Sequence, residues 1–172
     1  MTGKRTVRTR PRNGLAISDV LTAALISEMC APSAEFWLVS GWVTDIPVLD
    51  NSTRQFDAVM GSEARSQLTL SEVLGALTRR GTQLHVALRV VDHNNAFADR
   101  LMRVSDASAL SIYWSEDLHE KIMVGWDWVL KGSMNFTWNG MHRSEESIDF
   151  EVNSTEAAQQ RLELQTRWMG DA

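Results

Sequence analysis

Two strand patterns enclose a clearly bounded helix pattern, and this succession constrains the fold more than any other feature of the sequence. Thr69 and Glu72 form a capping box at the start of the helix, and Gly81 is a typical stop. Apolar residues alternate with other residues from Leu84 to Val90, as they do in a strand. A short apolar run at Phe36 to Ser40 suits a buried strand. Strand, helix and strand in this order predict a parallel crossover.

The alternation of helices and strands continues along the chain. We expect an N-terminal helix capped by Ser18 and ended by Pro32, and mostly loop over residues 43 to 68. The other expected elements are a helix capped by Asn94 or Asn95, strands at Leu110–Trp114, Leu118–Val124, Trp128–Leu130 and Ser147–Val152, and a helix from about Thr155 to Met169 that begins at Asn153. The short turn at residues 125–127 predicts an antiparallel hairpin. The expected fold is an α/β sandwich, a mixed β-sheet flanked by helices.

The N-terminus is strongly basic, whereas the rest of the chain is acidic. Five cations precede the first acid: Lys4, Arg5, Arg8, Arg10 and Arg12. Without them, 12 of the 17 Lys and Arg residues remain against 22 acids, a net charge of about −10. We expect a basic flexible arm over residues 1–14 and one domain over residues 15–172. Two interpretations of the arm stay open: it lies along nucleic-acid phosphates, or it is a solvated leader.

Composition and length exclude several classes of protein. With 44% hydrophobic and 23% charged residues, the 172-residue chain is neither disordered nor fibrous. No segment approaches the roughly 20 apolar residues of a membrane span, and polar residues follow the basic N-terminus, so we expect a cytoplasmic protein. Cys30 is the only cysteine and lacks the partners of a zinc site, and we expect no metal and no cofactor.

The expected strand at Leu118–Val124 carries His119 and Lys121 on one face, about 6.6 Å apart. A histidine that attacks phosphorus and a lysine that neutralises a phosphoryl oxygen need a spacing of this order, because both must reach the same tetrahedral group. The second strand of the hairpin ends at Gly132-Ser133-x-Asn135, which places a hydroxyl and an amide beside that face. Without this second motif, a His-x-Lys pair is more typical of a solvated strand face.

The stretch LHEKIMVGWDWVLKGSMNFTWNG resembles the signature of the phospholipase D superfamily, His-x-Lys followed after a hairpin by Gly-Ser-x-Asn. The small bacterial nucleases of that superfamily also carry a glutamate 13 residues beyond the serine, which is Glu146 here. The matching residues are His119, Lys121, Gly132, Ser133, Asn135 and Glu146. The aspartate that the family has five residues after the lysine is Trp126 here, and Asp127 follows one position late. That aspartate is taken to support the loop, so the departure concerns activity more than fold.

The resemblance implies a metal-independent phosphodiesterase, in particular a DNA-directed nuclease, with a phosphohistidine intermediate. His119 would attack the phosphorus, while Lys121 and Asn135 would hold the nonbridging oxygens. Ser133 would support the phosphate or position the histidine, and Glu146 would accept a hydrogen bond from the other imidazole nitrogen. The leaving group needs a proton from a second histidine, and no other histidine of the chain has a lysine two residues later. We therefore expect a homodimer with the site on its twofold axis.

Two other segments, RPRNGLAISDVL and WLVSGWVTDIPVLDN, resemble the DpdK branch of the superfamily, a phospholipase D-like component of bacterial clusters that insert and police 7-deazaguanine bases in DNA. This resemblance implies restriction of foreign DNA together with partner proteins of a defence system. A phospholipase has less support, because the sequence offers no amphipathic or aromatic membrane-binding segment. A noncatalytic interaction module stays open, motivated by Trp126 and the acidic domain.

Several further residues are candidates for the rim of the site. Ser40 and Trp42 end the first strand, where ligand clefts of open sheets form, so we expect them to contact substrate. Three tryptophans surround the motif and could stack on bases or belong to the core or dimer interface: Trp126, Trp128 and Trp138. The remaining histidines are His85 and His142, expected to be ordinary surface or core residues, and His93, beside a predicted helix cap.

Overall fold

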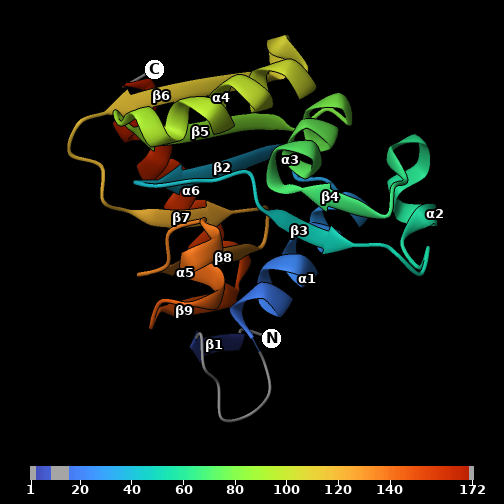
Figure 1. Cartoon of the computed structure of the whole chain (residues 1–172). Helices are drawn as coiled ribbons and strands as arrows, with labels where there is room; N and C mark the ends of the chain where they lie inside the picture. The colour runs from blue at the N-terminus through green and yellow to red at the C-terminus, as the bar shows by residue number, and fades with distance from the viewer. Residues whose placement is uncertain (1–2, 9–15, 171–172) are drawn as a thin grey trace.

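A seven-stranded mixed sheet runs through the centre of the molecule (Figure 1). The computed structural model describes residues 3–8 and 16–170. In sheet order the strands are β1 (Gly3–Arg8), β9 (Ser147–Val152), β8 (Trp128–Gly132), β7 (Lys121–Val124), β2 (Glu35–Ser40), β5 (Gln83–Arg89) and β6 (Leu110–Ser115). Strands β2, β5 and β6 are parallel, and all other neighbours are antiparallel. The expected mixed sheet, the parallel crossover and the hairpin are confirmed.

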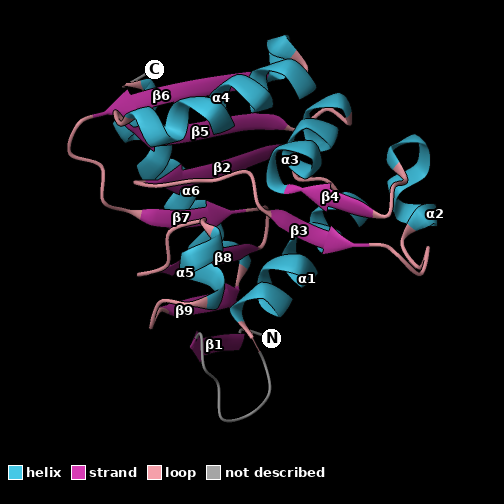
Figure 2. Cartoon of the chain, viewed as in Figure 1, coloured by secondary structure: helices cyan, strands magenta, loops and turns pink. Residues whose placement is uncertain are grey.

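Helices cover both faces of the sheet (Figure 2). One face packs against α1 (Ile17–Cys30), α3 (Leu70–Arg79), α4 (Asp92–Val104) and the short α5 (Trp138–His142), and the other face packs against α6 (Ser154–Met169). The side-chain alternation of β2 divides the core in two, because Phe36 and Leu38 face the first layer and Trp37 and Val39 face α6. None of the described helices is long and apolar enough to cross a membrane.

The helix starts follow the sequence signals in two cases and depart from them in two. Thr69 and Glu72 form the capping box of α3, where the Glu72 carboxylate accepts from the Thr69 backbone N–H at 2.9 Å. The Asn153 side chain caps α6 and accepts from the backbone N–H of Thr155 at 3.0 Å. Helix α4 begins at Asp92, so Asn94 lies inside its first turn rather than at the cap. Helix α1 begins at Ile17 after Ala16, so the expected cap Ser18 also lies inside the first turn.

Residues 43 to 68 contain more structure than the expected loop. They form β3 (Pro47–Asp50), α2 (Asp57–Met60), the 3₁₀ turn η1 (Gly61–Glu63) and, ending at the next residue, β4 (Gln67–Thr69), which pairs antiparallel with β3. Buried Asn51 holds this segment together, because its side chain accepts from the Phe56 N–H and donates to the Arg65 carbonyl. Strands of three or four residues are too short to show a periodic apolar pattern.

Within the expected flexible arm, residues Gly3–Arg8 are instead ordered in the sheet. These residues form edge strand β1, paired antiparallel with β9. Val7 is buried in the core, and the Asp149 carboxylate accepts from the Thr6 hydroxyl at 2.6 Å and pairs with Lys4 at 3.0 Å. The segment therefore pairs with the edge of β9 and buries one apolar side chain, although its basic composition predicts a solvated tail. Arg10 and Arg12 lie outside the described residues.

His85 is a core residue that packs between the sheet and α6. Its imidazole stacks on Trp37 at a centroid distance of 4.5 Å, and its Nδ1 lies 3.2 Å from the Tyr113 hydroxyl. Burial lowers the pKa of His85 from its ordinary value of 6.5, and the carboxylate of Glu35 opposes this effect more weakly. The folded protein therefore favours the neutral imidazole.

We expect acid to destabilise the protein through His85. Because the pKa is lower in the folded state, the stabilisation is fully present above about pH 6.5 and is lost as the pH falls through the folded-state pKa. Urea midpoints measured between about pH 8 and pH 5 should fall more for the natural protein than for His85→Gln. The exposed His142, replaced by Gln, is the control and should behave like the natural protein. An equal acid-induced fall in the His85→Gln variant would contradict the assignment.

Candidate active site

The ends of six neighbouring strands define one edge of the sheet, and β1 ends beside them at Arg8, opposite Ser147. Strands β2, β5 and β6 end there because they are parallel, and β7 begins there because it runs antiparallel to β2, with Ser40 opposite Lys121. The hairpin returns to the same edge at the end of β8, and β9 starts beside it, with Gly132 opposite Ile148. We call this edge the motif edge; its terminal strand residues are Ser40, Arg89, Ser115, Lys121, Gly132 and Ser147.

The motif edge brings together the residues of both sequence motifs. His119 and Lys121 flank the start of β7, and Ser133 and Asn135 follow the end of β8. Glu146 directly precedes β9. All five predicted catalytic residues therefore lie at adjacent strand ends, although 27 positions separate the first from the last. Alternating chain direction in β7, β8 and β9 is what places both motifs and the glutamate at one edge.

His119 lies outside the regular strand, which begins at Lys121 rather than at the predicted Leu118. The His119 side chain is exposed and makes no hydrogen bond within the described part of the chain. Leu118 is fully buried against the α6 side of the sheet. The Lys121 ammonium donates to the His119 backbone carbonyl, so the lysine and the histidine segment are in direct contact. This arrangement leaves the imidazole accessible to a ligand from solvent.

Gly41 allows the His119 segment to lie against the end of β2. A Cβ atom at Gly41 would meet the Leu118 carbonyl oxygen at 3.0 Å and would lie 3.9 Å from the Cα of His119. The same position is 3.8 Å from the Asn135 Oδ1. A larger residue would therefore press on both motifs at once. Sequence reasoning missed this residue, and a glycine directly after a buried strand was the available signal.

Ser133 and Glu146 form a hydrogen-bonded pair. The Ser133 hydroxyl donates to the Glu146 carboxylate and accepts from the Ser147 backbone N–H at 3.1 Å. The Ser133 N–H in turn donates to the Ser147 carbonyl at 3.0 Å. The serine hydroxyl therefore has a fixed orientation at the start of β9, and its proton is directed at the carboxylate.

Asn135 carries an unsatisfied acceptor. Its Oδ1 is buried and has no hydrogen-bond partner among the described residues. Buried side-chain oxygens are rarely left without a donor, so this position suits a donor that arrives with a ligand. Asn135 also lines a cavity of about 330 Å³ with Trp42 and Trp138. The amide thus lies between the motif edge and the cavity.

The two predicted rim residues differ in their surroundings. Ser40 is fully buried, and its hydroxyl donates to the Trp42 carbonyl at 2.7 Å. Ser40 therefore positions the following turn instead of facing solvent. Trp42 is exposed, its ring lies 5.1 Å from the His93 imidazole, and it lines the cavity. Of the two, Trp42 is the residue that a ligand can reach.

Asn94 fixes the segment that carries Trp42. Its side chain is buried, accepts from the Val43 N–H at 2.9 Å and donates to the carbonyls of Gly41 at 3.0 Å and Arg89 at 2.9 Å. One amide thereby ties the ends of β2 and β5 to the first turn of α4. This tertiary role explains why Asn94 lies inside the helix, where a capping role was expected.

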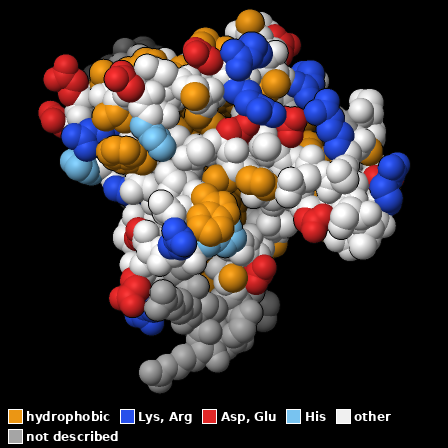
Figure 3. Space-filling model, in the orientation of Figure 1, with side chains coloured by type: hydrophobic (Ala, Val, Ile, Leu, Met, Phe, Trp, Pro, Cys, Tyr) orange, Lys and Arg blue, Asp and Glu red, His pale blue; other side chains and the backbone are white. Residues whose placement is uncertain are grey.

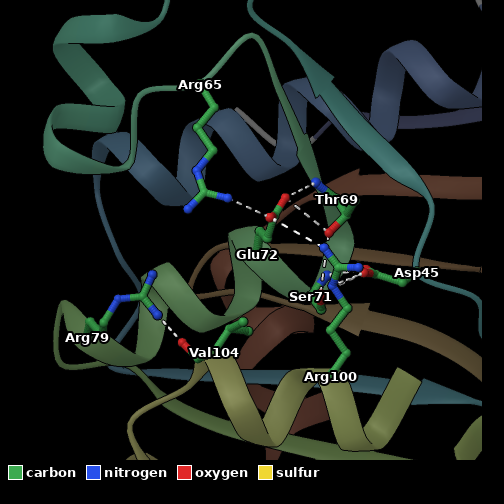
Figure 4. A network of polar contacts seen from close by, with 8 residues as sticks. All are labelled: Asp45, Arg65, Thr69, Ser71, Glu72, Arg79, Arg100 and Val104. Carbon is green, nitrogen blue, oxygen red and sulfur yellow. Dashed lines mark hydrogen bonds and ion pairs between the residues drawn. The ribbon is translucent and has the colours of Figure 1, made fainter. Parts of the chain in front are cut away.

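Asp45 fixes the other end of the same segment (Figure 4). Its carboxylate accepts from the Ser71 N–H at 2.8 Å and the Ser71 hydroxyl at 2.9 Å, and it pairs with the Arg100 guanidinium at 2.8 Å. Arg100 also reaches Glu72 at 3.5 Å. Residues 41 to 45 are therefore anchored at both ends, and Trp42 stands on a constrained turn.

The other tryptophans near the motif lie in different places. Trp128 is buried in the core, and Trp126 is 60% exposed in the hairpin turn, at the opposite edge of the sheet. Of these three tryptophans, Trp138 lines the cavity together with Trp42; it lies on α5 and is 51% exposed. Within the described residues, no three His, Cys, Asp or Glu side chains form a group that could hold a metal ion.

Solved structures match this architecture, whereas no protein-family model and no curated protein sequence matches the chain. Nuc from Salmonella typhimurium, a phospholipase D family member, superposes with a TM-score of 0.62 at 14% identity, over 98% of this chain and 95% of that chain. NucT from Helicobacter pylori superposes with a TM-score of 0.63 at 12% identity, over 96% and 95% of the two chains. The chain has the phospholipase D fold.

A larger enzyme contains a similar unit. Polyphosphate kinase from Porphyromonas gingivalis superposes with a TM-score of 0.63 at 14% identity, over 99% of this chain and 26% of that chain. The same fold therefore occurs in proteins of different activity, and the residues at the motif edge decide what chemistry this protein supports.

Proposed function

We propose that the protein is a metal-independent phosphodiesterase, specifically a DNA-directed nuclease that acts through a phosphohistidine intermediate. The observation that carries this proposal is the convergence of His119, Lys121, Ser133, Asn135 and Glu146 at adjacent strand ends. An imidazole, a cation, a fixed hydroxyl and an amide at adjacent strand ends are the set of groups that a phosphoryl transfer needs. The phospholipase D fold supports the same class of chemistry.

The first step is an attack by His119 on phosphorus. A bond forms between an imidazole nitrogen and phosphorus, and the bond from phosphorus to the leaving oxygen breaks. Lys121 and Asn135 hold the nonbridging oxygens and stabilise their developing charge. The alkoxide takes its proton from a second, protonated histidine, which then accepts a proton from the water that cleaves the phosphohistidine. Glu146 orients the Ser133 hydroxyl, and contact with the imidazole is a further role that we propose for the carboxylate.

The second histidine comes from a second copy of the chain in this proposal. Each chain supplies one His-x-Lys motif, so a twofold homodimer completes the site. Two apolar side chains, Val90 and Trp114, are exposed beside the motif edge at the ends of β5 and β6. Exposed apolar groups next to an incomplete site favour an interface at this edge.

Hydrolysis without metal tests the proposal directly. The pure protein in EDTA should cleave single-stranded, duplex or supercoiled DNA, or bis(4-nitrophenyl) phosphate, and quenching during turnover should trap a phosphorylated His119. Activity that appears only with added magnesium would contradict the mechanism. Loss of hydrolysis on every substrate would leave the noncatalytic module, although its main motivation, Trp126, lies at the opposite edge from the motif.

The biological setting that we propose is restriction of foreign DNA in the cytoplasm, with partner proteins of a defence system. Two sequence segments with a DpdK-like pattern support this setting. One of them spans residues 37–51, which include β2 and the anchored turn with Trp42. The DpdK-like pattern therefore covers residues beside the motif edge.

The N-terminal arginines should guide DNA to the motif edge. Arg8 lies opposite Ser147, so the chain leaves β1 beside Glu146 and continues towards Arg10 and Arg12. The variant with all three arginines replaced by Gln should bind DNA more weakly, and the slope of log K against log salt should flatten by up to about 3 units, while hydrolysis of a small phosphodiester is retained.

A matched control separates position from charge. Arg5→Gln removes one exposed cation from the middle of β1, away from the motif edge, and should change the slope less than Arg8→Gln. An unchanged DNA affinity and salt slope in the triple variant would indicate that the basic segment does not bind DNA and serves only as a structural strand with a solvated continuation.

A further inference from the structure

A cavity of about 330 Å³ opens beside the motif edge, between the Trp42 turn and α5. Its lining includes Trp42, His93, Asn135, Thr137, Trp138 and Asn139. This volume is at the lower end of the range for small-molecule sites, so it suits one ring system rather than a length of polymer. Figure 3 shows hydrophobic and histidine side chains gathered in this region of the surface, whereas Lys and Arg gather over α3 and the end of α4.

The cavity has two large aromatic side chains that remain exposed. Trp42 is 43% exposed and Trp138 is 51% exposed. Each is supported by a neighbour: His93 lies 5.1 Å from the Trp42 ring, and His142 lies 5.1 Å from the Trp138 ring. The Arg143 guanidinium stands 5.7 Å from the Trp138 centroid. Supported tryptophans at a concave site provide flat surfaces for a planar ligand.

Polar groups in the cavity match the edge of a nucleobase. Asn135 contributes its buried, unsatisfied Oδ1 as an acceptor, and the exposed Asn139 carries an amide that can both donate and accept. Asn and Gln amides pair well with base edges because they present a donor and an acceptor side by side. Among the described residues that line the cavity there is no carboxylate, in a domain with a large excess of acids. A base inside the cavity therefore meets no carboxylate in the described lining of the cavity.

The cavity lies close to the segment that carries the proposed nucleophile. Asn135 lines the cavity, and its Oδ1 and the Cα of His119 both lie within 4 Å of the position of a Cβ at Gly41. Asn135 therefore connects the lining of the cavity with the segment that carries His119.

We propose that this cavity binds one unstacked nucleobase of the DNA next to the phosphate that is cleaved. The proposal rests on the proposed nuclease function and specifies its substrate class. A base inside a duplex is stacked and paired, so only a single-stranded or flipped-out nucleotide can enter the cavity. The protein therefore acts on single strands in preference to duplex, and Trp42 and Trp138 are specificity residues for the reaction.

The test compares two single-stranded oligonucleotides that differ only in their bases. One carries ordinary bases and the other carries abasic sites at every position near the cleavage point. Trp42→Ala and Trp138→Ala should each lower kcat/KM on the first strand by about 10- to 100-fold, mainly through KM, because stacking on one base is lost. On the abasic strand the same variants should stay within about threefold of the natural protein. Trp42→Phe should restore most of the loss.

Trp126→Ala is the matched control, because it removes an exposed tryptophan from the opposite edge of the sheet. It should leave kcat/KM unchanged on both the normal and the abasic strand. Equal losses of kcat/KM on both strands would overturn the proposal. The same holds if the natural protein cleaves duplex DNA and abasic DNA as fast as the normal single strand. Sedimentation of each variant separates another outcome: loss of the dimer in Trp42→Ala or Trp138→Ala would assign that side chain to an interface between copies.

A binding measurement keeps the base site testable if the nuclease proposal fails. Protein with His119→Asn should bind a short single-stranded oligonucleotide more tightly than its abasic counterpart, and a second substitution, Trp42→Ala, should remove about 10-fold or more of this preference. Absence of hydrolysis with this binding pattern intact would reject the nuclease and retain the base site. Equal binding of the two strands would reject the base site.

Discussion

The substitution His119→Asn is expected to abolish phosphodiester hydrolysis, with kcat at least about 1,000-fold lower, while the protein stays folded. Asparagine cannot form the nitrogen–phosphorus bond of the intermediate, and loss of a nucleophile has effects of this size or larger in other hydrolases. The His119 side chain is exposed and makes no hydrogen bond in the described part of the chain, so the free energy of unfolding should change by less than about 0.5 kcal/mol. Steady-state rates and urea unfolding measure the two quantities.

The neighbouring residue provides the control for this substitution. Glu120 is exposed and its carboxylate pairs with Arg167 of α6. Glu120→Gln should keep the hydrolytic rate within about twofold, because it alters the charge beside His119 without removing a reacting group. Similar losses in both variants would indicate that the segment, rather than the imidazole, is what the reaction needs.

A dimer with one natural chain and one His119→Asn chain tests the composite site. It retains one nucleophile but lacks the histidine that protonates the leaving group and activates water. Its rate should be far below half of the natural rate, and any covalent adduct should persist. Half of the natural rate would mean that each chain works alone and would remove the need for a shared site.

Much of the motif edge could be predicted from the sequence because its residues follow regular elements. The strands that carry the two motifs have alternating or continuous apolar patterns, so their order and the hairpin between them were predictable. Placement of Glu146 beside Ser133 follows from the same alternation of chain direction, because β9 must begin where β8 ends. Local periodicity and hairpin topology were sufficient for these positions.

The parts that sequence reasoning missed depend on contacts between distant segments. Asn94 is a polar residue near a helix start, and only its contacts with Gly41 and Val43 show that it anchors the turn after β2. Edge strand β1 is equally non-local, because it pairs with β9 at the other end of the chain, where Val7 lies opposite Ile148. The cavity between Trp42 and Trp138 joins two turns that no spacing rule relates.

The position of Trp126 illustrates a third case, a departure from a family pattern that other residues compensate. The turn at residues 125–127 is held without the family aspartate. On one side, the Trp126 N–H donates to the Ser33 hydroxyl at 2.7 Å. The Ser33 hydroxyl in turn donates to the Glu28 carboxylate, which also accepts from the Trp128 indole at 2.7 Å. On the other side, Arg161 of α6 donates to the carbonyls of Gly125 and Trp126. Residues far away in the sequence therefore hold the turn.

Replacement of Arg161 by Ala is therefore expected to destabilise the protein by about 2–4 kcal/mol. The Arg161 guanidinium is nearly buried, lies 4.9 Å from the Trp126 centroid and satisfies two carbonyls of the turn. Loss of the donor to the carbonyl of buried Gly125 costs about 1–3 kcal/mol, and the partly buried carbonyl of Trp126 adds a smaller cost. Urea unfolding at neutral pH measures the change in the free energy of unfolding.

Arg167→Ala on the same helix is the control for charge and helix propensity. Arg167 pairs with Glu120 where both side chains are about half exposed, and such a pair contributes less than about 1 kcal/mol. Because the turn lies at the opposite edge from His119, the Arg161→Ala protein that remains folded should keep the hydrolytic rate of the natural protein. A loss of stability no larger than that of Arg167→Ala would show that the turn does not depend on Arg161, and the compensation for the missing aspartate would then have to come from Glu28 and Ser33 alone.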